Sequence, residues 1–81
     1  MQVRLLLFAV LRDIVGAPER RLSLPEGATA MDVWNELRSQ FAQLDGYRLP
    51  PMIAVNQNYV SPETVLNDGD ELAFIPPVAG G

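Results

Sequence analysis

The sequence predicts an α+β roll in which one main helix crosses a face of a mixed sheet of four to five strands. Short apolar or alternating runs, separated by turn residues, occur on both sides of a single amphipathic segment. That segment, residues 29–41, shows the three- and four-residue apolar spacing of a helix with one buried stripe. The 81 residues include no cysteine, so a single hydrophobic core without disulfides has to stabilise the fold.

The first expected strand is the apolar run over residues 3–11. Its side chains alternate between two sides, with Leu6 and Phe8 on the second, which predicts a central strand covered on both faces. A partner protein can cover the second face, because an exposed apolar patch often marks a binding footprint. A short turn is expected to follow, since Gly16 can adopt a positive φ and Pro18 prevents a long helix.

A second strand and the main helix come next. Residues 19–24 alternate polar and apolar side chains, which predicts a hairpin partner of the first strand with one solvent-facing side. The helix is expected to begin after Thr29, whose hydroxyl caps the first turn while Asp32 occupies the capping-box position. Trp34 lies within the apolar stripe and is interpreted as a core residue, not a ligand platform.

The elements after the helix are predicted from turn residues and short apolar runs. They are a loop over 45–51, a strand over 52–56, a turn over 56–58, a brief strand over 59–60, a short helical turn over 61–63, apolar packing at 65–66, a tight turn over 67–70 and a last strand over 71–75. Asp68, Asp70 and Glu71 lack the spacing of a calcium loop, so a turn is predicted there and no metal site. In this topology the first and last strands lie side by side in the centre.

Composition excludes most kinds of self-contained catalysis. All six basic residues are arginine, and the chain has no histidine and no cysteine. It therefore offers no thiolate nucleophile, no imidazole base, no lysine Schiff base and no soft zinc ligands, so no catalytic residue and no metal site is predicted. The net charge of -4 argues against nucleic-acid binding, and the longest apolar run is too short to span a membrane. A cytoplasmic protein that is not an enzyme by itself is expected.

The last residues are predicted to form a flexible tail, 77–81, after a folded domain over 1–76. Two prolines fix φ and stiffen the exit from the last strand, and the terminal glycines have no Cβ, so the tail suits a narrow slot in another protein. The Gly81 carboxylate is the predicted reactive group. The residues expected to thread into the slot with it are Pro76, Pro77, Val78, Ala79 and Gly80. The plain alternative is a frayed terminus.

Several blocks of residues, in a fixed order, carry a family resemblance. They are Phe8-Ala9 with Arg12-Asp13 and Gly16, then Ala54 to Gln57, Asn67 to Phe74, and Pro76 to Gly81. Together they resemble the ubiquitin-like sulfur carriers, and within them the MoaD-type small subunits of molybdopterin synthase, over the whole chain. Ile75 and Ala79 are conservative departures from the family's usual residues. The resemblance implies a ubiquitin-like β-grasp roll.

The resemblance also implies a role in molybdenum cofactor biosynthesis. An E1-like adenylyltransferase would use ATP to adenylate the Gly81 carboxylate, and a sulfurtransferase would supply sulfur to form a thiocarboxylate. The large subunit of molybdopterin synthase would then receive the tail and transfer its sulfur to cyclic pyranopterin monophosphate, in a heterotetramer. The carrier itself would bind no cofactor. Phe8, Tyr59 and Ile75 match apolar contact positions of the family and are the predicted partner interface; the alternative is that they fill the chain's own core.

Three other functions remain open from the sequence. A thiamine-pathway carrier would deliver sulfur to a thiazole synthase, although such carriers are usually shorter and lack the paired prolines. A ubiquitin-like protein modifier would join its tail to lysines of target proteins. A β-grasp interaction module would use the same fold with no chemistry at the tail. The sequence leans away from the thiamine-pathway carrier, and the motif blocks argue against an interaction module without tail chemistry. A search for conjugates is what would separate the carrier from a protein modifier.

Overall fold

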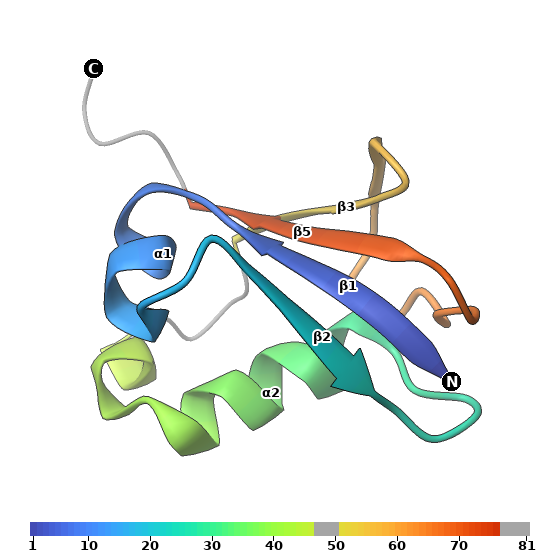
Figure 1. Cartoon of the computed structure of the whole chain (residues 1–81), viewed down its shortest axis with the longest axis horizontal. Helices are drawn as coiled ribbons and strands as arrows, with labels where there is room; N and C mark the ends of the chain where they lie inside the picture. Colours follow the sequence, from blue (N-terminus) through green and yellow to red (C-terminus); the bar gives the residue numbers. More distant parts are fainter. Residues whose placement is uncertain (47–50, 77–81) are drawn as a thin grey trace.

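A five-stranded sheet and one long helix form the body of the protein in the computed structural model, which describes residues 1–46 and 51–76 (Figure 1). A shorter helix and a 3₁₀ helix complete the elements. In chain order these are β1 (Gln2–Leu7), α1 (Ala9–Val15), β2 (Glu19–Ser23), α2 (Ala30–Gln40), η1 (Ala42–Gly46), β3 (Met52–Val55), β4 (Asn58–Val60) and β5 (Glu71–Ile75). The predicted α+β roll with one main helix is confirmed.

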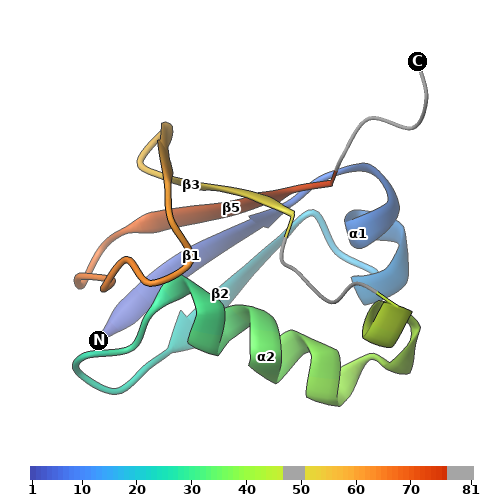
Figure 2. The same ribbon diagram turned by 180° about the vertical axis from the view of Figure 1, so that it is seen from behind.

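The sheet is mixed and has the strand order β2-β1-β5-β3-β4. The two central neighbours, β1 and β5, run parallel, whereas β2, β3 and β4 each join the sheet by antiparallel pairing. The first and last strands therefore lie side by side, as the sequence predicted. Helix α2 covers one face of the sheet, which we call the inner face (Figures 1 and 2). The opposite face, the outer face, is not covered by either α-helix.

Helix α2 begins where the sequence predicted, because Thr29 and Asp32 cap it reciprocally. The Asp32 amide donates to the Thr29 hydroxyl at 3.1 Å, and the Thr29 amide donates to the Asp32 carboxylate at 2.9 Å. Each hydrogen bond satisfies an amide that the first helical turn leaves without an intrahelical partner.

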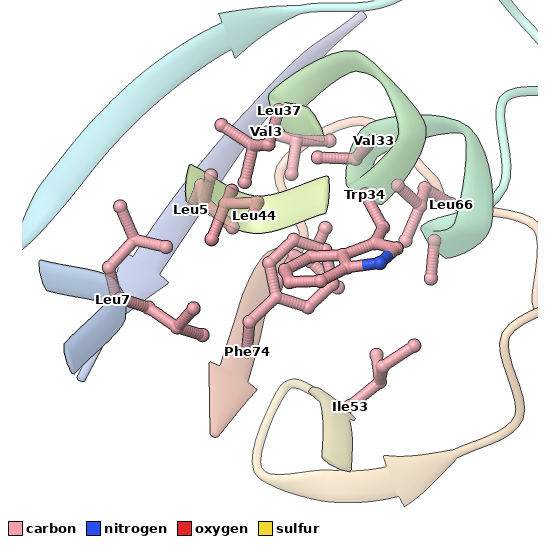
Figure 3. Packing of buried hydrophobic residues seen from close by; sticks show 13 residues of the cluster. Val3, Leu5, Leu7, Val33, Trp34, Leu37, Leu44, Ile53, Leu66 and Phe74 are labelled. Atoms are coloured by element: carbon pink, nitrogen blue, oxygen red, sulfur yellow. The ribbon is translucent and has the colours of Figure 1, made fainter. Parts of the chain in front are cut away.

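The core lies between α2 and the inner face of the sheet (Figure 3). Trp34 of α2 meets Phe74 of β5 edge to face, with ring centroids 5.2 Å apart and planes at 72°. The edge-to-face arrangement is one of the two that aromatic quadrupoles favour. Both side chains are fully buried, so the interpretation of Trp34 as a core residue is confirmed. The other buried members of the cluster are Val3, Leu5, Leu7, Leu11, Ala30, Val33, Leu37, Leu44, Ile53, Leu66 and Leu72.

The prediction of one long first strand over 3–11 is wrong in its second half. Strand β1 ends at Leu7, and helix α1 begins at Ala9 in place of the expected short turn. An apolar run fits either period, and here Leu11, Ile14 and Val15 have the three- and four-residue spacing of a helix, with Leu11 buried and the other two packed against the core. The predicted positive φ of Gly16 is confirmed at 88°, where this residue ends α1.

Smaller differences occur after α2. Asp45 and Gly46 belong to η1, and the rest of the loop predicted over 45–51 falls largely on residues 47–50, outside the described residues. The turn predicted over 56–58 is confirmed, with Asn56 and Gln57 at φ values of 50° and 70°. Two successive positive φ values give the tight hairpin turn that matches strand twist.

Apolar packing at 65–66 is only half right, because the Leu66 side chain is buried whereas Val65 is 54% exposed. The segment predicted as a short helical turn over 61–63 is a single reverse turn, which is closed by a 3.1 Å hydrogen bond from the Thr64 amide to the Ser61 carbonyl. A turn of this kind satisfies one amide without continuing into a helix.

The aspartates just before β5 accept hydrogen bonds from amide groups in and around the predicted turn. Asp68 accepts the Gln2 amide at 2.6 Å, and Asp70 accepts the Asn67 amide at 2.8 Å and the Asn56 side-chain amide at 3.0 Å. Across residues 1–46 and 51–76, no three histidine, cysteine or acidic side chains form a group that could hold a metal ion. In the same ranges no helix has the length and hydropathy needed to cross a membrane.

Candidate functional site

The outer face carries alternate residues of the same strands that build the core. In β1, Val3, Leu5 and Leu7 point inward and are buried, so Arg4 and Leu6 point outward. Strand pairing then arranges the outward residues in rows across the sheet. Successive rows lie two residues apart along a strand, or about 7 Å.

One row of the outer face is largely apolar and has a charged residue at its β2 end. Leu6 of β1 pairs with Glu19 of β2 on one side and with Ala73 of β5 on the other. Ala73 pairs with Ala54 of β3, and Ala54 pairs with Tyr59 of β4. The alanines leave the middle of this row low, because their side chains end at Cβ.

The low middle of the row is the floor of a depression of about 210 Å³, which we call the apolar depression. Its lining residues are Leu6, Phe8, Ala54, Gln57, Tyr59, Glu71, Ala73 and Ile75. They come from β1, β3, β4 and β5 and from the turns that follow β1 and β3, so the depression exists only once the sheet has formed.

All three residues predicted as a partner interface line the apolar depression. Phe8 is 44% exposed, Tyr59 is 69% exposed and Ile75 is half-buried. Two large apolar side chains therefore remain in solvent at one place, and the alternative that Phe8 and Tyr59 fill the chain's own core is wrong. Contact with another protein stays the prediction for these residues, because an exposed apolar cluster of this kind is characteristic of a binding surface.

Local backbone geometry holds Phe8 at the rim. Phe8 is the N-cap of α1 with extended φ and ψ of -124° and 152°, and its carbonyl accepts the Leu11 amide at 3.1 Å. The next residue, Ala9, has a φ of 50°, a value uncommon for any residue other than glycine. The chain thus turns sharply from β1 into α1 and leaves the Phe8 ring exposed beside the sheet.

The chain leaves the sheet beside this depression. Ile75 is the last residue of β5 and lines the depression, and Pro76 follows it directly and is buried. Because β5 is a central strand, the exit point lies in the middle of the sheet and not at an edge. The other tail residues of the prediction, Pro77 to Gly81, lie outside the described residues.

Sequence reasoning missed the residues that form the floor of the depression. Ala54 and Ala73 are small residues within strands, and nothing in the sequence singled out either as part of a surface, beyond its place in a predicted strand. Their signal was present in the period of two, which places Ala73 on the opposite side from Leu72 and Phe74. It could not show that two alanines from strands far apart in the sequence face each other.

The neighbouring row of the outer face is charged. Arg4 of β1 stands between Arg21 of β2 and Glu71 of β5. The Arg4 guanidinium makes an ion pair with Glu71 and a second, at 3.6 Å, with Glu19. Glu71 lines both the apolar depression and a shallow polar hollow of about 430 Å³ over this row. The outer face is therefore apolar near the end of β5, where the chain leaves the sheet, and charged in the neighbouring row.

Comparison with known proteins points to one family. The ThiS family matches residues 5–81. A molybdopterin synthase sulfur carrier subunit from Arabidopsis thaliana is 35% identical over 81 residues, which cover 100% of this chain and 84% of that protein.

Solved structures share the fold over almost the whole chain. A putative molybdopterin converting factor subunit 1 from Pyrococcus furiosus has a TM-score of 0.85 and 31% identity, over 96% of this chain and 99% of that one. The small archaeal modifier protein 1 from Methanosarcina acetivorans has a TM-score of 0.77 and 31% identity, over 99% and 96% of the two chains. The chain is similar to both proteins, so the reaction at its tail has to distinguish a carrier function from a modifier function.

Proposed function

The chain belongs to the ThiS family, and we propose that it is the sulfur carrier subunit of molybdopterin synthase in molybdenum cofactor biosynthesis. Its fold is the ubiquitin-like β-grasp roll of its structural relatives. The observation that carries the proposal is similarity over the whole of this chain to a protein of that name, together with a fold shared with a solved relative.

The proposed chemistry takes place at the Gly81 carboxylate. One carboxylate oxygen attacks the α-phosphorus of ATP in a partner adenylyltransferase, and pyrophosphate leaves. The outer sulfur of a persulfide on the sulfurtransferase then attacks the acyl carbon, the acyl-oxygen bond breaks, and AMP leaves. The resulting acyl disulfide between the chain and the donor is cleaved at its S–S bond by a thiol reductant, which supplies two electrons, and a thiocarboxylate remains on Gly81. Activation is required because a carboxylate is a poor electrophile. The thiocarboxylate gives a chain without cysteine a nucleophilic sulfur.

The geometry supports a carrier that docks and presents its tail. The apolar depression lies beside the point where β5 ends, so a partner that covers it would stand next to the emerging tail. Phe8 and Tyr59 would bury exposed aromatic surface in that contact, which is a typical source of binding energy at interfaces. We propose the large subunit of molybdopterin synthase as this partner, with the catalytic residues on its side.

The test is the intact mass of the protein after incubation with ATP, an adenylyltransferase and a sulfur donor. Exchange of one terminal oxygen for sulfur should raise the mass by the difference between those atoms. The modification should disappear when the large subunit and cyclic pyranopterin monophosphate are added. A chain that lacks only Gly81 should gain no sulfur while its stability stays unchanged, and modification of that truncated chain would refute the assignment of Gly81.

A second candidate function, protein modification, is favoured by similarity to the small archaeal modifier protein 1. In that case the activated tail would be discharged by lysine amines of other proteins. Covalent adducts with target proteins, found by denaturing electrophoresis and mass spectrometry, would support it. Discharge by thiazole synthase alone would instead indicate the thiamine pathway, and no modification with competent partners would leave an interaction module.

A further inference from the structure

In the part of the chain that the structure describes, the charged row of the outer face contains one cation that makes no ion pair. Arg4 and Arg21 are direct cross-strand partners on neighbouring strands. Like charges placed opposite each other destabilise a sheet. Glu71 and Glu19 both pair with Arg4, whereas Arg21 is exposed and makes no ion pair within residues 1–46 and 51–76. Folding stability therefore does not explain why an arginine stands at position 21.

The charged row is continuous with the proposed docking surface. Glu71 lines both the apolar depression and the polar hollow, which Arg4 and Arg21 also line. Arg21 lies in the charged row. The neighbouring row, which contains Leu6 and Ala73, is about 7 Å away along the strands. A protein that covers the apolar depression and extends over the sheet toward β2 would reach Arg21.

We infer that Arg21 is a specificity-determining residue of the docking surface, where it pairs with a carboxylate of the partner protein. The inference rests on the proposed function, because the partner is taken to be the large subunit of molybdopterin synthase. The charge would act mainly on recognition: it speeds productive encounter and disfavours partners with a basic group at that place. Among the charged side chains of the row, Arg21 is the one without a partner in the described structure.

The chain offers a closely matched control for this inference. Arg20 is adjacent in the same strand but lines a groove between β2 and α2 on the other face of the sheet. The substitutions Arg21→Gln and Arg20→Gln make the same change in net charge and the same change in side chain. Only the first removes a cation from the outer face.

The experiment measures the Kd and the association rate of the full chain with its cognate large subunit at several salt concentrations. Arg21→Gln should raise Kd roughly two- to fivefold, and Arg21→Glu about tenfold or more, with a weaker salt dependence of association for Arg21→Gln. Arg20→Gln should stay within about twofold of the wild type. Thermal stability of Arg21→Gln should be equal or slightly higher, because a like-charge pair is removed.

Equal Kd values for both glutamine variants would overturn the inference. If Phe8→Ala still weakens binding in that case, docking through the outer face stands and only the role of Arg21 is lost. Failure of the wild-type chain to bind the large subunit would overturn the proposed function and this inference together. Weaker binding by Arg21→Gln that tracks a loss of folded protein would also count against a role in recognition.

Discussion

The two faces of the central sheet come from the same strands, yet they are built for different purposes. On the inner face Leu5, Leu72 and Phe74 are completely buried and pack beneath α2. On the outer face Phe8 and Tyr59 stay in solvent at the rim of a depression with alanine side chains at its floor. Successive side chains of a strand point to opposite faces, so alternate residues of one strand belong either to the core or to the outer surface. Stability should depend on the inner set, and partner binding on the outer set.

The largest effect should come from the inner face. Phe74→Ala removes the ring that meets Trp34 edge to face and leaves a cavity in the centre of the core. We expect a loss of about 3 to 5 kcal/mol in the free energy of unfolding, measured by urea denaturation. For an 81-residue domain this is a large share of the total, so much of the variant should be unfolded. A loss below about 1 kcal/mol would mean that the two faces do not divide stability from binding.

The intermediate effect should come from the outer face and should appear only in binding. Phe8→Ala should cost about 2 kcal/mol of binding free energy toward the large subunit, roughly a thirtyfold rise in Kd. Its free energy of unfolding should fall by less than about 1 kcal/mol, because much of the ring is already in water. Isothermal calorimetry and denaturation on the same preparations give both values.

Val65→Ala is the matched control for Phe8→Ala. Val65 is another exposed apolar residue, but it does not line the apolar depression. Its truncation should leave Kd unchanged within about twofold. Equal weakening by the two substitutions would point to a general loss of apolar surface, and the special role of the depression would be refuted.

The two faces also differ in how far the sequence could predict them. The inner face follows from local pattern: the Thr29 and Asp32 cap, the stripe of α2 and the alternation in β1 all appear in the sequence and in the structure. The outer face depends on register between strands that are distant in the chain. Ala54 and Ala73 pair only through the β3 to β5 ladder, which no local pattern reveals. Family resemblance predicted a partner interface at Phe8, Tyr59 and Ile75. Only the folded structure shows that these three residues line one depression.

The junction between β1 and α1 shows the same difference at one point in the chain. A uniformly apolar run does not tell strand from helix, since both periods place apolar residues inward over a few positions. In the structure the run is divided between a strand and a helix at Phe8 and Ala9, where the backbone changes from extended to left-handed and then to helical. Alanine is a poor residue for a positive φ, so no residue type at this position indicated a turn.

The smallest effect should come from that junction, and it should move stability and binding in opposite directions. Glycine adopts a positive φ without the Cβ penalty that Ala9 incurs at 50°, but it adds entropy to the unfolded chain. Ala9→Gly should therefore change the free energy of unfolding by less than about 1 kcal/mol, in the stabilising direction. The same freedom should loosen the Phe8 ring beside the depression and raise Kd for the large subunit roughly two- to fivefold. A joint fall in stability and affinity would instead show that the junction only supports the core, and that the outer face gains nothing from a strained turn.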